Sequence, residues 1–317
     1  MKFPVFDMHC DTALALLGED LHGDANLMRN NLQIDLSRAG KLDGYCQTFA
    51  CFTTPAMEKW YGVSPVVVFE KELEAIRREL AVCHDYIRQA YTVKDIESNL
   101  EQGKMSAILS IEGPAGIGFD PELLEDLYKI GFRITSLGWN EQNILTGSNA
   151  TGGGLTDRGR EYVREAQRIG MVIDTSHISD EGFFDIMDIT EKPVVATHSN
   201  SRTVCSHSRN LTDEMFLEIC KTGGACGINL YTEFLGQDPD LDTVCDHIFH
   251  FMELDPTGTH IALGGDLDGC ETLPAGFSGV GDYPMLIQRM LDRGLDEKTV
   301  RNICWNNAME VLKRCCM

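Results

Sequence analysis

The sequence predicts a (β/α)8 barrel, the TIM-barrel architecture, and two observations point to it. Eight short runs with the composition of buried strands occur along 317 residues, and most are separated by stretches with helical periodicity. This alternation and this length are typical of a parallel barrel surrounded by helices. An open, doubly wound sheet would also alternate, but neither of the usual glycine-rich nucleotide-binding motifs is present. No shift in composition marks a boundary, so we expect residues 1–317 to form a single barrel domain.

The expected strands are apolar or β-branched runs, most of which end in polar residues or in glycine. They span residues 5–11, 44–53, 106–112, 132–137, 171–177, 193–199, 224–230 and 261–269.

The expected helices lie between these runs and begin or end at recognisable signals. Pro65 occupies the first turn of one helix, and Gly170 ends another. The helices are expected at residues 65–90, 93–102, 121–130, 156–169, from Ser179 onward, 212–221, 283–293 and 296–314. Two segments are expected to be loops: residues 20–42 over the mouth of the barrel, and the glycine-rich residues 147–154.

Composition excludes some classes of protein. The formal net charge of −22 opposes binding to nucleic acid, because a polyanion would be repelled. No run reaches the ~18 uncharged apolar residues of a membrane span. The first strand begins at Val5, which leaves no room for a signal peptide before it. We therefore expect a cytoplasmic protein whose 12 cysteines are reduced thiols.

Side chains of the types that bind metals gather at one end of the expected strands. They are His9, Asp11, Glu112, His177, His198 and Asp266. All lie at carboxyl ends, where the functional residues of such barrels converge. Each has a structural alternative, since a histidine can be hydrogen-bonded in the core and a carboxylate can cap a turn. Their coincidence on five strands favours a nitrogen-and-oxygen site for zinc or a similar divalent ion, such as manganese or cobalt.

The set has more ligands than one tetrahedral ion needs. Two ions ~3.5–4 Å apart that share a carboxylate would use them, hold a bridging hydroxide and polarise a carbonyl group. Asp266, which follows Gly264 and Gly265, is the candidate for proton transfer. Arg209 would bind a substrate carboxylate, or else form a surface salt bridge. We assign no role to the remaining histidines, which are His22, His84, His207, His247, His250 and His260.

Several of these motifs in combination resemble the membrane (renal) dipeptidase family of binuclear zinc peptidases, and its soluble microbial members most of all. The resemblance covers nearly the whole chain. Its carriers are Phe6-Asp7-Met8-His9-Cys10-Asp11, Ser110-Ile111-Glu112-Gly113, residues 170–179 and 193–199, Ser208-Arg209-Asn210 and residues 264–269.

The resemblance implies a role for each residue that matches. His9 and Asp11 would bind the first zinc ion, His177 and His198 the second, and Glu112 would bridge the two. Asp266 would be the acid and base, and Arg209 would hold the C-terminal carboxylate of a small dipeptide, including dipeptides that end in a D-amino acid. Trp139 stands where some members have a histidine that contacts the scissile carbonyl oxygen. Its indole N–H can donate a hydrogen bond but cannot titrate.

The resemblance also suggests a homodimer, whereas the membrane anchor of the animal members does not carry over. Two other functions remain open. One is a different binuclear amidohydrolase, either a cyclic-amide hydrolase or a deaminase. The other is a barrel that binds metal without catalysis, which the retained Asp266 disfavours.

Overall fold

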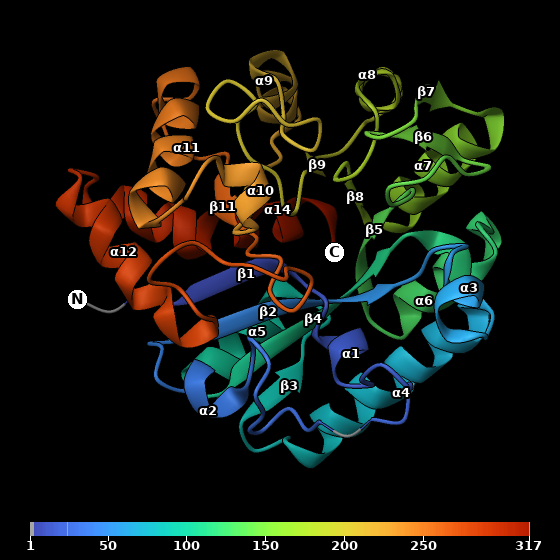
Figure 1. Ribbon diagram of the computed structural model, residues 1–317, viewed down its shortest axis with the longest axis horizontal. Coiled ribbons are helices and arrows are strands. Elements are labelled where there is room, and N and C mark those ends of the chain that lie inside the picture. Colours follow the sequence, from blue (N-terminus) through green and yellow to red (C-terminus); the bar gives the residue numbers. More distant parts are fainter. Residues whose placement is uncertain (1–2, 24, 317) are drawn as a thin grey trace.

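The strands of the protein form a nearly closed parallel barrel inside a layer of helices (Figure 1). The computed structural model describes residues 3–23 and 25–316. The strand order is β10-β11-β1-β2-β4-β5-β8-β9, and a bridge between Ala196 and Cys226 joins its two ends. The predicted (β/α)8 barrel is therefore confirmed.

The strands lie where the sequence predicts them, but those of the second half are short. Their bounds are β1 Val5–Cys10, β2 Tyr45–Phe52, β4 Met105–Glu112, β5 Phe132–Ser136, β8 Val172–Asp174, β9 Val194–Val195, β10 Cys226–Ile228 and β11 Ile261–Leu263. The polar residues expected at the ends of β8, β9 and β11 thus lie in the turns that follow these strands.

Helices surround the barrel, and several of them begin at a good local start signal. The longer ones are α4 Pro65–Val82, α5 Val93–Glu101, α6 Leu124–Lys129, α7 Asp157–Ile169, α8 Asp180–Met187, α9 Asp213–Thr222, α11 Leu241–Leu254, α12 Tyr283–Asp292 and α14 Asn307–Cys315. Short helices lie in the connections, at α1 Thr12–Ala15, α2 Leu36–Ala39, α3 Met57–Tyr61, α10 Thr232–Leu235 and α13 Glu297–Arg301. The Ser64 and Ser179 hydroxyls accept bonds from the first turns of α4 and α8, and Gly170 ends α7 in the left-handed conformation.

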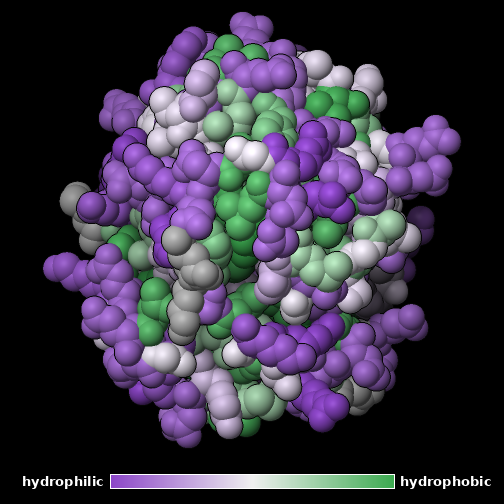
Figure 2. Space-filling view, turned by 90° about the vertical axis from the view of Figure 1, so that its left-hand side faces the viewer, coloured by the Kyte–Doolittle hydropathy of each residue, from purple (hydrophilic) through white to green (hydrophobic). Residues whose placement is uncertain are grey.

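Two apolar layers hold the barrel together. Inside it, side chains such as Phe6, Met8 and Ile134 cluster with Leu312 of α14, which closes the end where the strands begin. Between the strands and the helices lies a larger cluster that includes Phe132 and Tyr162. The face shown in Figure 2 is mainly hydrophilic, with hydrophobic residues in a central strip and in smaller scattered patches. No described helix is long and apolar enough to cross a bilayer.

Four expectations about local structure are wrong. The helix expected to reach residue 90 ends at Val82, and Ile87–Gln89 form a short strand, β3, paired with β4. Residues 241–254 form α11, which we did not expect, and α2 interrupts the loop expected at residues 20–42. The last expected helix is divided into α13, a π-helical segment Asn302–Asn306 and α14.

The glycine-rich segment is also not the loop expected from its composition. It forms a hairpin of β6 Thr146–Ser148 and β7 Gly152–Leu155. A Cβ atom on Gly147 would lie 1.8 Å from the Gly152 carbonyl oxygen. The glycine thus permits two backbones to approach closely, as glycines often do within strands.

Candidate active site

His9 reaches the interior of the barrel through a bulge in β1. Between Asp7 and Cys10 the register with β2 shifts, so that one extra residue is inserted in β1. Phe6 and Met8 face inward, and Cys10 packs in the outer core. Such bulges re-aim side chains next to functional sites. His9 and Asp11 do lie together, with 3.6 Å between Nε2 and Oδ2. Asp11, however, already begins the turn into α1, so simple strand alternation is not the reason.

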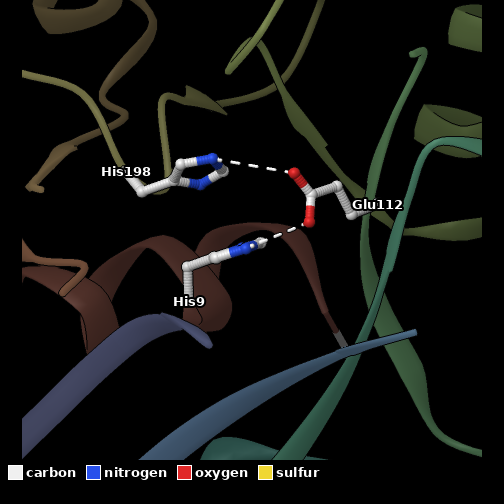
Figure 3. A group of neighbouring side chains, drawn as sticks. All are labelled: His9, Glu112 and His198. Carbon is white, nitrogen blue, oxygen red and sulfur yellow. Dashed lines mark ion pairs between the residues drawn. The ribbon is translucent and has the colours of Figure 1, made fainter. Parts of the chain in front are cut away.

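Glu112, the last residue of β4, lies at the centre of the site (Figure 3). Its Oε2 atom is 3.2 Å from Nε2 of His9. Its Oε1 atom is 3.0 Å from Nε2 of His177 and 3.8 Å from Nε2 of His198. One oxygen of the carboxylate therefore faces His9, and the other faces His177 and His198.

Hydrogen bonds determine which nitrogens His177 and His198 present to the site. Nδ1 of His177 donates to Oδ1 of Asn140 at 2.8 Å. The Thr197 hydroxyl donates to Asp174 and accepts from Nδ1 of His198 at 2.8 Å. Partners of this kind orient the histidine ligands of metals and select the tautomer. Both Nε2 atoms consequently carry lone pairs, and they lie only 2.9 Å apart.

Asp11 and Asp266 approach the same point from two different turns. Oδ1 of Asp266 is 3.8 Å from Nε2 of His9, and its Oδ2 accepts a bond of 3.0 Å from the Asn229 amide. A Cβ atom on Gly269 would lie 2.1 Å from Oδ2 of Asp11 and 2.7 Å from Oδ1 of Asp266. Asp266 has a φ of +57°, an uncommon conformation for a residue with a side chain. Such conformations are often found at functional sites.

The electrostatics show a surplus of buried negative charge. Burial raises the pKa of Asp266 to about 7, and it raises that of Asp11 to about 6, with a further contribution from Glu112. Burial lowers the pKa of His9, but Glu112 and Asp11 more than compensate, so the net shift is upward. Burial lowers the pKa values of His177 and His198, which are neutral.

The donor set fits divalent cations. Nε2 of His9 and Oδ1 of Asp11 are buried without a hydrogen-bond partner. The lone pairs of His177 and His198 repel one another at 2.9 Å unless a positive charge lies near both. Imidazole nitrogens and carboxylate oxygens suit zinc and similar ions. Two clusters of ligand-type atoms lie in the site, His9-Glu112-His198 and His9-Asp11-Asp266, and they share His9. With His177 the site has six ligand-type side chains, which is more than the four ligands of a tetrahedral ion.

A cavity of about 780 Å³ opens onto this centre. Arg209, expected to bind a carboxylate, lines it and is buried. Nη2 of Arg209 donates to the His198 carbonyl at 3.3 Å, and its Nε has no partner. Trp139 also lines the cavity, with its ring 5.2 Å from Phe52 and 6.0 Å from His177. All residues singled out from the sequence for this site therefore meet at one rim.

Other residues of the site were not found from the sequence. Asn229 lies near the carboxyl end of the seventh expected strand, residues 224–230, but an amide there does not point to a metal or to proton transfer. Asn140 and Thr197 orient His177 and His198 by hydrogen bonds, and no sequence pattern points to them. His207, to which we assigned no role, and Tyr231 line the cavity near Arg209.

Comparisons with known proteins point to one family. Residues 1–316 match the family model described as membrane dipeptidase, peptidase family M19. The chain is 32% identical over 216 residues to an uncharacterized dipeptidase of Schizosaccharomyces pombe, and the match covers 66% of this chain and 53% of that protein. It is 32% identical over 252 residues to dipeptidase aclJ of Aspergillus oryzae, covering 76% of this chain and 60% of that one. The matches thus span between half and two thirds of these relatives.

Solved structures give the same result over full lengths. A metallopeptidase of Rhodobacter sphaeroides, with a bound phosphinate mimic of the dipeptide L-Ala-D-Ala, is 27% identical. It superposes with a TM-score of 0.87 over 99% of this chain and 100% of that one. With a family model that matches nearly every residue, the chain belongs to the membrane dipeptidase family, peptidase family M19.

Proposed function

We propose that the protein is a metal-dependent dipeptidase that uses two divalent ions, with zinc as the first candidate. The observation that supports this most directly is the position of Glu112. Its two oxygens lie 3.2 Å from His9 and 3.0 Å from His177, on opposite sides of one carboxylate. In this proposal His9 and Asp11 would hold one ion, His177 and His198 would hold the other, and Glu112 would be shared by both. Two such ions polarise a carbonyl group and make water a nucleophile near neutral pH.

Asp266 is the proposed acid and base. It lies beside His9, and the Asn229 amide orients its second oxygen. A carboxylate there can take a proton from the attacking water and pass it to the leaving amine nitrogen. The new amino terminus then leaves as a neutral amine, and Asp266 returns to its starting state.

Arg209 is the proposed anchor for the substrate. Its unpaired Nε is buried beside the cavity, and a buried donor of this kind is costly unless a ligand satisfies it. A peptide carboxylate would accept from a guanidinium with two parallel bonds. Because Arg209 would bind the carboxylate and not the side chain, we propose that dipeptides with a C-terminal D-residue are accepted. The relative from Rhodobacter sphaeroides was crystallised with a mimic of such a dipeptide, which supports this. The indole N–H of Trp139 is proposed to donate to the substrate's carbonyl oxygen.

The test is hydrolysis of a panel of L-L and L-D dipeptides by zinc-loaded protein of measured metal content. We expect Asp266→Asn to lower kcat by about 10²- to 10⁴-fold with two ions still bound. Unchanged hydrolysis by this variant would exclude the proposed mechanism.

Arg209→Ala separates a dipeptidase from other amidohydrolases of this architecture. We expect it to abolish measurable dipeptide hydrolysis, mainly because KM rises when the substrate carboxylate loses its partner. The control is Arg168→Ala, because the Arg168 guanidinium binds Glu165 and Glu125 on the surface. If Arg209→Ala has no effect, while the wild-type protein hydrolyses cyclic amides better than dipeptides, the enzyme is a cyclic-amide hydrolase.

A further inference from the structure

A third cluster of ligand-type side chains lies outside the candidate active site. Among the described residues, three groups of three such side chains have ligand atoms within 4.8 Å of one another. Two of them share His9 and belong to the active site. The third consists of Cys220, Asp255 and His260, all partly buried. We propose that this cluster is a separate binding site for a zinc-type divalent cation.

The three residues come from elements that the fold places side by side. Cys220 lies in the last turn of α9, and Asp255 ends α11. The two helices lie side by side (Figure 1). Between them the rings of Phe216 and Phe251 are stacked, with 4.1 Å between their centres. His260 directly precedes β11, so the cluster lies at the amino ends of the strands, away from the active-site rim.

The partners of His260 prepare it to bind a cation. Its Nδ1 donates to the Gly224 carbonyl at 2.7 Å. The neutral ring therefore carries its lone pair on Nε2, and a backbone carbonyl of this kind is a usual second partner of histidine ligands.

Asp255 is likewise held in place before any cation binds. Its Oδ1 accepts from the backbone and hydroxyl of Thr257, and its Oδ2 accepts from the Thr259 amide at 3.1 Å. These bonds fix the orientation of the carboxylate, and Oδ2, which accepts a single bond, keeps a lone pair for a further partner.

A path from solvent reaches the cluster. Cys220 and His260 both line a cavity of about 560 Å³ on the surface. Three protein ligands leave a fourth tetrahedral position for water on this side. The donor set of sulfur, nitrogen and oxygen selects zinc or cobalt over magnesium or calcium, which prefer oxygen alone. The cation would join α9, α11 and the start of β11.

Cobalt(II) distinguishes this site from the active site, whose proposed ligands include no sulfur. Thiolate ligation gives Co²⁺ a charge-transfer absorption in the near ultraviolet. We expect Co²⁺ titration of the protein to produce this band, zinc to displace it, and Cys220→Ser to abolish it. We expect Asp255→Asn to weaken Co²⁺ binding at this site at least tenfold.

The matched control is Cys205→Ser, since Cys205 is also half-buried but lies in a turn outside this cluster. It should keep the band. A wild-type protein without the band, or a band that persists in Cys220→Ser, overturns the proposal. The readout does not depend on dipeptide hydrolysis, so it holds whether or not the proposed function is correct.

Discussion

Gly269 lies so close to two carboxylates of the site that a side chain there would meet both. An alanine Cβ there would lie 2.1 Å from Asp11 and 2.7 Å from Asp266. Its φ is not in the left-handed region, so the backbone itself tolerates alanine. We expect Gly269→Ala to displace both carboxylates, to lower the bound metal, and to reduce kcat/KM about 100-fold or more, as small displacements in active sites do. Metal analysis and dipeptide kinetics measure both effects.

Gly281→Ala is the control for this substitution. A Cβ atom on Gly281 would make an ordinary contact of 3.5 Å with Arg38. It should leave metal content and activity unchanged. A Gly269→Ala protein with normal metal and normal kinetics would show that the site has room that the structure does not indicate.

For single residues, the sequence predicts a functional role only where the residue type is itself typical of one kind of chemistry, such as metal binding. His9, Glu112 and His198 could be found because imidazole and carboxylate groups at strand ends suggest a metal. Asn229 and Thr197 could not, because an amide or a hydroxyl occurs everywhere in a protein. Their role comes from a neighbour that lies far away in the chain, such as Asp266 beside Asn229.

At the scale of elements, α12 is connected to the site through one buried carboxylate. The Tyr283 hydroxyl donates to Asp7 in β1. Asp7 also accepts from the backbone amides of His9 and Gly265, each at 3.0 Å. One side chain thus holds β1 and the turn after β11 together, and these carry His9 and Asp266.

We therefore expect Tyr283→Phe to affect both stability and catalysis. The lost donor leaves a buried carboxylate oxygen unpaired, at a cost of about 1–3 kcal/mol. We expect kcat/KM to fall about 10- to 100-fold, as it does for outer partners of metal ligands. Chemical denaturation and dipeptide kinetics of the loaded protein test the two effects.

Tyr162→Phe is the comparison. The Tyr162 hydroxyl bonds to Thr135 at 2.8 Å, in the outer core and remote from the cavity. Tyr162→Phe should lower the free energy of unfolding by about 0.5–1.5 kcal/mol and leave kcat/KM unchanged. Equal kinetic effects of the two variants would contradict a specific connection through Asp7.

Elements were predicted well where local signals and tertiary contacts agree, as in α7 with its cap at Gly170. They were predicted wrongly where pairing overrides the local pattern. Ile87 fits a helical spacing, yet it pairs with Met105 across a short ladder. The bulge in β1 also leaves no mark in the sequence, because it is defined by the register with β2.

At the scale of the whole molecule, the barrel brings together ligands that are distant in the chain. His9 and Asp266 are separated by most of the sequence, and they meet because every strand points its carboxyl end to the same rim. The identity of the fold and the place of the site could therefore be predicted together. The distances within the site could not, because they depend on turns such as those that follow β8 and β9.

The free energy of unfolding of the metal-free protein should depend on pH, because the barrel gathers carboxyl groups in a buried site. Above pH 6.5, unfolded carboxyls are ionised and unfolded histidines are mostly neutral. The folded protein still holds protons at Asp266, whose pKa burial raises to about 7, and at Glu72, whose pKa burial raises strongly. Glu72 is fully buried, and neither of its oxygens has a partner. Because the folded state binds more protons, the free energy of unfolding falls as pH rises.

We expect this fall between pH 6.5 and 8 in protein treated with chelator. Below that window the lowered pKa values of His177 and His198 act in the opposite sense, since their protonation favours unfolding. In loaded protein, cations replace the protons near the site, so the profile should be flatter. Glu72→Gln should reduce the slope of the metal-free protein by up to about 1.4 kcal/mol per pH unit. Urea denaturation at several pH values gives the slope for the metal-free protein, the loaded protein and the Glu72→Gln variant. Equal slopes with and without metal would contradict the view that protons bound near the metal site cause the pH dependence.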